Sequence, residues 1–138
     1  MNSQPFVDAN IFLRFLTKDD VKKAEKCFQL FQKAERKEIS LTTSEAVLSE
    51  VVYILSSKRL YQLKTSEIKE RLWPLISISG LKLPSKKRFL LALDIYAKNN
   101  IDFADALTVA HLYQSKTKKV YSYDRDFDRF PKIQRLEP

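Results

Sequence analysis

The chain has 138 residues, of which 44% are hydrophobic, and this is enough for one globular domain, residues 1–138, with its own core. Its 25 lysines and arginines exceed its 17 aspartates and glutamates and give a formal charge of +8, which favours a polyanionic partner, although solubility alone could account for the same charge. A single cysteine, Cys27, excludes an internal disulfide and a thiolate zinc cluster, and a single glycine, Gly80, excludes glycine-rich phosphate loops.

The first third of the chain alternates short apolar runs with amphipathic segments. Residues 5–7 predict a short buried strand, and residues 10–16 predict a short helix. A longer helix begins at the acidic pair 19–20 and carries apolar residues in steps of three and four as far as position 34. A second strand is predicted at 39–42, and a helix capped by Thr43 or Ser44 extends from there to about residue 56.

The rest of the chain continues this alternation. Residues 67–77 have a helical pattern, but an internal proline should kink or end that helix. A turn and a short strand are predicted at 79–84, a helix capped by Ser85 at 85–99, a further helix at 103–115, and a strand at 120–123. Strands that alternate with helices predict an α/β fold with parallel strand pairing.

The N-terminal and hydropathy patterns indicate where the protein resides. Residues 1–4 are polar and precede only a short apolar stretch, so we expect no signal peptide. No apolar run approaches the length of a transmembrane helix, so no membrane partner is expected. Together with the single cysteine, these features predict a cytoplasmic protein.

Four carboxylates stand next to apolar segments. Asp8 and Asp124 follow predicted strands, Glu50 lies in the middle of the helix at 43–56, and Asp105 lies in the first turn of a later helix. Residues at the carboxyl ends of parallel strands face one crevice, and carboxylates near apolar surface are costly unless a partner compensates them. We therefore expect these four side chains to share Mg²⁺ or Mn²⁺, which prefer hard oxygen ligands.

Each carboxylate also has a purely structural interpretation. Asp8 and Asp105 could cap or stabilise helix starts, and Asp124 could cap a turn. Glu50 could form an ion pair or face solvent. The only histidine, His111, is expected to be an ordinary helix residue, so the sequence does not support Ser-His or Cys-His catalysis.

Four segments, taken in order, resemble the PIN-domain ribonucleases, and most of all the VapC-type toxins of toxin–antitoxin modules. They are FVDANIFLRFL at 6–16, LSEV at 48–51, DFADAL at 102–107 and VYSYDRDF at 120–127. The resemblance implies a three-layer α/β sandwich whose central, mostly parallel sheet of four or five strands is flanked by helices. It also implies an endoribonuclease that hydrolyses RNA phosphodiester bonds with Mg²⁺ or Mn²⁺, forms a homodimer and is inhibited by a cognate VapB-like antitoxin.

The resemblance further implies roles for individual residues. The four carboxylates named above become a catalytic and metal-binding quartet, with Asp126 as an alternative for the fourth position. Asn10 and Ser122 become supporting residues, and Arg14 becomes a contact to substrate or to the antitoxin. Two other functions stay open at this point: a PIN-fold nuclease of RNA processing, and a non-catalytic basic protein that binds nucleic acid.

Overall fold

The structure is a computed structural model that describes residues 4–138. Residues 1–3, on which the signal-peptide expectation partly depends, lie outside the described residues. In the part of the chain that is described, no helix combines the length and the apolar character needed to cross a membrane.

Six α-helices make up most of the fold, and four short strands accompany them. The helices are α1 (Ala9–Thr17), α2 (Val21–Glu35), α3 (Glu45–Ser56), α4 (Thr65–Ile76), α5 (Lys86–Asn99) and α6 (Phe103–Tyr113), and a 3-10 helix, η1, spans Arg125–Arg129. The strands are β1 (Leu41–Thr42), β2 (Leu81–Lys82), β3 (Lys119–Tyr121) and β4 (Gln134–Leu136). All six predicted helices are confirmed, whereas β4 was not predicted.

Local side-chain chemistry accounts for several helix boundaries. The Asp20 carboxylate accepts a hydrogen bond from the Lys23 amide (3.1 Å), and the Ser44 hydroxyl accepts one from the Val47 amide (3.1 Å), so both act as N-caps. Ser85 stands at the N-cap of α5, but its side chain makes no capping bond, so that part of the prediction is wrong. Ser85 instead adopts a left-handed backbone conformation with φ of 58°.

The prediction that Pro74 ends its helix is wrong, and the kink that was its alternative stays a prediction. Pro74 lies inside α4, and the helix neither ends there nor stops before Ile76. A proline deprives the carbonyl four residues earlier of its donor, but that residue, Glu70, is exposed and can be solvated. Leu75 and Ile76 are buried in the core, and their packing favours two more helical residues beyond the proline.

The strands pair in parallel, as predicted, but in two separate places. β1 pairs with β2, β3 pairs with β4, and Phe6 forms an isolated parallel bridge with Thr42. Among residues 4–138 these pairings do not join into one sheet. The continuous sheet of four or five strands therefore stays a prediction, and residues 5–7 form a bridge in place of the expected strand.

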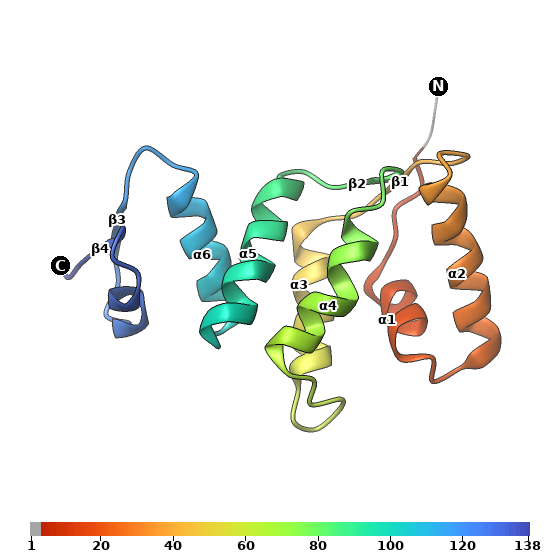
Figure 1. Ribbon diagram of the computed structural model, residues 1–138, viewed down its shortest axis with the longest axis horizontal. Coiled ribbons are helices and arrows are strands. Elements are labelled where there is room, and N and C mark those ends of the chain that lie inside the picture. Colours follow the sequence, from red (N-terminus) through yellow and green to blue (C-terminus); the bar gives the residue numbers. More distant parts are fainter. Residues whose placement is uncertain (1–3) are drawn as a thin grey trace.

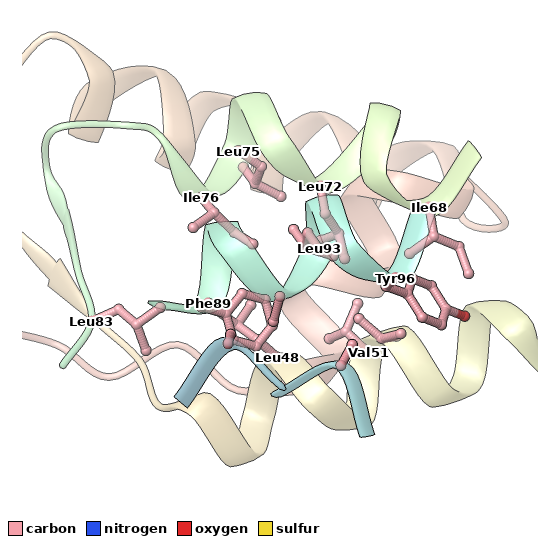
Figure 2. Packing of buried hydrophobic residues seen from close by; sticks show 14 of the residues in the cluster. Leu48, Val51, Ile68, Leu72, Leu75, Ile76, Leu83, Phe89, Leu93 and Tyr96 are labelled. Carbon is pink, nitrogen blue, oxygen red and sulfur yellow. The ribbon is translucent and has the colours of Figure 1, made fainter. Parts of the chain in front are cut away.

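The two strand pairs lie far apart along the molecule (Figure 1). β3, β4 and η1 are at one end beside α6, and β1, β2 and residues 5–7 lie near α1 and α2, with the other helices between. The centre of the core comes from α3, α4 and α5, where Leu48, Ile68 and Leu93 are fully buried (Figure 2). The C-terminal unit, defined as residues 119–136, is attached by Phe127, Phe130 and Ile133, which are also buried.

Gly80, in the turn before β2, packs closely against the backbone at the end of α2, and replacing it tests this contact. A Cβ at Gly80 would lie 2.2 Å from the Ala34 carbonyl oxygen and 2.8 Å from the Ile39 carbonyl oxygen. Because backbone atoms cannot move aside cheaply, we expect Gly80→Ala to lower the free energy of unfolding by about 1 to 3 kcal/mol. Urea denaturation measures this, with Ser79→Ala at the exposed neighbouring position as the control. Equal stability of the two variants would contradict the close approach.

Candidate active site

Three aspartates from two separate parts of the chain converge at the start of α6. Asp105 is in the first turn of α6, Asp124 follows β3, and Asp126 lies in η1. Each offers a carboxylate oxygen, and these three atoms all lie within 4.8 Å of one another. The structure thus brings together Asp105 and Asp124 of the expected quartet, and adds Asp126.

Local hydrogen bonds hold the loop that carries Asp124. The Asp124 amide donates to the Ser122 hydroxyl (3.0 Å), and the Asp126 amide donates to Asp124 Oδ1 (2.9 Å). Asp124 therefore does cap a turn, as its structural interpretation suggested. Only one of its carboxylate oxygens is used in this way, so the other stays available to a ligand.

The three carboxylates repel one another. The pKa of Asp105 is raised, first by its burial and then by the negative charges of Asp124 and Asp102. None of the ion pairs within residues 4–138 involves Asp105, Asp124 or Asp126. The cluster therefore carries uncompensated negative charge that a bound cation would stabilise.

This repulsion predicts how stability depends on pH without divalent cations. Since the folded pKa of Asp105 lies above its unfolded value, its contribution to stability is full below the unfolded pKa and is lost as the pH rises through the folded pKa. We expect Asp105→Asn to raise the Tm at neutral pH in EDTA, and the gain to vanish near pH 3.5, roughly the range where an ordinary aspartate titrates.

A second aspartate provides a control of opposite sign. The pKa of Asp94 is lowered, chiefly by its hydrogen bond with Lys69 (2.7 Å), so Asp94 contributes stability above its unfolded pKa and loses it as the pH falls. Asp94→Asn should therefore lower the Tm at neutral pH. A lower Tm for Asp105→Asn as well, in the same buffer, would show that the cluster is not under electrostatic strain.

The other two members of the expected quartet lie outside this cluster. Asp8 directly precedes α1, is exposed, and makes no side-chain capping bond to the helix, so its structural interpretation as a cap is wrong. Glu50 lies in the middle of α3 and is exposed, and within the described residues it forms no ion pair. Their assignment to the site stays a prediction.

The supporting residues are placed by α1 and the Asp124 loop. Asn10 is exposed near the start of α1, and Arg14 is half-buried further along the same helix, so neither touches the three-aspartate cluster. Ser122 supports the cluster through the Asp124 backbone, as described above. His111 is exposed in the last turn of α6, as expected for an ordinary helix residue.

A cleft of about 910 Å³ lies between α3 and the start of α6. Asp102 and Ala104, which precede Asp105 by three residues and by one residue, line the cleft. Three basic residues of the α3–α4 connection, Lys58, Arg59 and Lys64, also line the cleft, whereas none of the three clustered aspartates does. The sequence did not single these residues out, because lysines are spread along the whole chain, although the adjacent pair at 58–59 in a loop was a weak signal.

Comparisons with known proteins place the chain in a family. A family model described as PIN domain matches residues 6–133, which include all the carboxylates discussed above. A search of curated proteins finds no match to this chain.

Proposed function

The chain belongs to the PIN domain family, and we propose that it is a divalent-metal-dependent endoribonuclease that acts as the toxin of a toxin–antitoxin pair. PIN domains are generally nucleases, so hydrolysis of phosphodiester bonds is the coarse function of the family. The observation that carries the proposal is the convergence of carboxylate oxygens of Asp105, Asp124 and Asp126 within 4.8 Å of one another, at a place where residues 4–138 form no ion pair with them.

The chemistry of these residues fits Mg²⁺ or Mn²⁺. All three offer hard carboxylate oxygens, and the pKa of Asp105 is raised first by burial and then by the negative charges of its neighbours. We propose that Asp105 and Asp124 hold the cation, with Asp126 beside them, and that Asp8 and Glu50 complete the set. A bound divalent cation would supply activation of the attacking water and neutralisation of charge on the scissile phosphate.

The chain's own residues would bind and orient the RNA. Lys58, Arg59 and Lys64 line the cleft that reaches the start of α6, where they can contact phosphates. The formal charge of +8 would attract the polyanion over a longer range. The basic residues would then hold the RNA backbone in the cleft, and the acidic cluster, which lies next to the cleft at the start of α6 and does not line it, would act on the adjoining phosphate.

The toxin role rests on the resemblance of the four sequence segments to VapC-type proteins. An antitoxin that inserts an arginine or lysine near Asp105 and Asp124 would compete with the cation and block phosphate entry together. Arg14 on α1 could contact an acidic segment of that antitoxin. The proposal includes a homodimer in the cytoplasm, and a role in RNA processing is the alternative within the same family.

Removal of the metal tests this proposal. We expect end-labelled single-stranded RNA to stay intact when the protein is assayed in EDTA, and cleavage to return when excess Mg²⁺ or Mn²⁺ is added. The physical reason is that clustered carboxylates without a cation repel the phosphate. Cleavage at the full rate in EDTA, from protein purified with chelator, would exclude a metal-dependent mechanism.

A further inference from the structure

Residues 5–7 have one free edge. The Val7 amide donates to the Thr42 carbonyl (2.8 Å), and the Thr42 amide donates to the Pro5 carbonyl (2.8 Å), so these groups of residues 5–7 face β1. Successive backbone groups of an extended chain point to opposite edges, so the amide and carbonyl of Phe6 face away from β1. Within the described residues no backbone hydrogen bond satisfies them, and the Phe6 side chain is 59% exposed.

Among residues 4–138, β3 also has an edge without backbone partners. The Gln134 amide donates to the Lys118 carbonyl (2.8 Å), and the Ser122 amide donates to the Leu136 carbonyl (2.9 Å), so the even-numbered residues face β4. The backbone groups of Lys119 and Tyr121 therefore face outward, and the Tyr121 side chain is 71% exposed. Unpaired strand edges of this kind tend to pair with another chain.

The two free edges match in register. If residues 5–7 lay parallel to β3, the Phe6 amide could donate to the Lys119 carbonyl, and the Tyr121 amide could donate to the Phe6 carbonyl. Phe6 would then stand opposite Val120, and Asp8 would stand opposite Ser122. Because parallel strands end at the same side of a sheet, Asp8 would reach the Asp124 loop.

The folded chain holds these edges apart from each other. The Lys118 ammonium donates to the carbonyls of Leu112, Tyr113 and Ser115 at 2.8 to 2.9 Å, which fixes the connection from α6 to β3. The C-terminal unit also packs on α6 through an edge contact between Tyr113 and Phe130 (6.4 Å). Several helices lie between β3 and residues 5–7 (Figure 1), so pairing within one chain would require this packing to break.

The chain exposes more surface than a compact monomer of its mass, and assembly of two chains would explain the excess. The chain exposes 8910 Å², whereas a compact monomer of 16.2 kDa is expected to expose about 7,500 Å². The excess of roughly 1,400 Å² on each of two chains would give about 2,800 Å² of buried surface, within the range of obligate dimers. Two copies related by a twofold axis can satisfy both edges of both chains at once.

We propose that a second copy of this chain pairs through these two edges, with residues 5–7 of one copy parallel to β3 of the other. Asp8 of one copy then joins Asp105 and Asp124 of the other, so each site is completed in trans. The completion of each site in trans rests on the proposed function. The pairing of these edges between two copies, called the strand exchange from here on, does not.

Cross-linking tests the strand exchange without any activity assay. In a Cys27→Ala background, Phe6→Cys and Val120→Cys are combined, because neighbouring strands place opposite Cα atoms about 4.8 Å apart, within disulfide range. We expect mild oxidation to give a covalent dimer that reduction reverses, while each single-cysteine variant gives only background. A covalently closed monomer would mean that the chain pairs with itself, and two free thiols would mean that the edges do not meet. Either result overturns the proposal.

Complementation then tests the shared site. Asp8→Asn and Asp124→Asn, each inactive alone, should recover cleavage when co-expressed, up to about one quarter of the normal activity if chains assort at random into dimers. Asp105→Asn with Asp124→Asn is the matched control, which should stay inactive because both residues come from the same copy. No recovery in the first pair, with both variants folded, would overturn completion in trans. If Asp8→Asn alone keeps full activity, the site assignment fails, and the cross-link still decides the exchange.

Discussion

Asp124→Asn is expected to slow single-turnover RNA cleavage at saturating Mg²⁺ by more than about 100-fold, which is the upper range for changes beside a metal ligand. β3 ends at Tyr121, two residues before the predicted end at Tyr123, and Asp124 follows it as the N-cap of η1, with its carboxylate in the three-aspartate cluster. Asparagine can keep the hydrogen bond from the Asp126 amide but loses the charge. The loss should therefore appear in cleavage while the fold is preserved.

Two neighbouring aspartates provide the controls. The Asp128 carboxylate is half-exposed, accepts a hydrogen bond from Arg135 Nε (3.1 Å) and lies outside the three-aspartate cluster, so Asp128→Asn should leave the cleavage rate nearly unchanged. Asp126 was given in the sequence analysis as an alternative for the fourth position, and its carboxylate belongs to the cluster together with that of Asp124. We expect Asp126→Asn to cost about 10- to 100-fold. A larger effect for Asp126→Asn than for Asp124→Asn would make Asp126 the fourth carboxylate.

Asp8→Asn is expected to abolish cleavage without lowering the Tm. The Asp8 side chain is exposed and makes no capping bond to α1, so the fold does not depend on its charge. The proposed site does depend on the Asp8 carboxylate. When residues 5–7 of one copy pair with β3 of the other, Asp8 lies next to the cation-binding residues. Cleavage assays and thermal melts of the same preparation measure the two effects separately.

A capping aspartate gives the opposite pattern and serves as the control. Asp20 caps α2 through the Lys23 amide, so Asp20→Ala should lower the free energy of unfolding by about 0.5 to 2 kcal/mol while the folded protein cleaves RNA at the normal rate. If Asp8→Asn instead lost stability and kept cleavage, Asp8 would be a structural residue and would leave the proposed site.

The helices and the caps of α2 and α3 were predictable because they depend on neighbours in the chain, whereas the capping bonds expected from Ser85 and Asp8 do not form. Asp20 and Ser44 cap their helices by accepting hydrogen bonds from amides three residues further along the chain. The spacing of apolar residues identified the buried face of each helix. Pro74 misled the prediction because its local cost is outweighed by the burial of Leu75 and Ile76, which is a property of the whole core. β4 was missed because three residues with one large apolar side chain carry too little pattern.

The candidate site was predictable in part. Asp105 and Asp124 were expected to converge, from a helix start and a strand end, and they do. The position of Asp126 depends on the 3-10 turn of η1, and the basic side of the cleft depends on how the α3–α4 connection packs against the start of α6. Neither arrangement leaves a periodic signal in the sequence.

Side-chain type, spacing and capping act between residues close in the chain, so they were enough to predict the helices, the parallel sense of the strand pairs and the candidate carboxylates. Which strands pair, which carboxylates meet and which edges of residues 4–138 stay unpaired depends on the folded chain as a whole. Strand pairing joins segments as far apart as Phe6 and Thr42. Its outcome depends on the balance between the free energy gained by the surface that the whole chain buries and the entropy lost in closing each loop. No short window of sequence contains that balance.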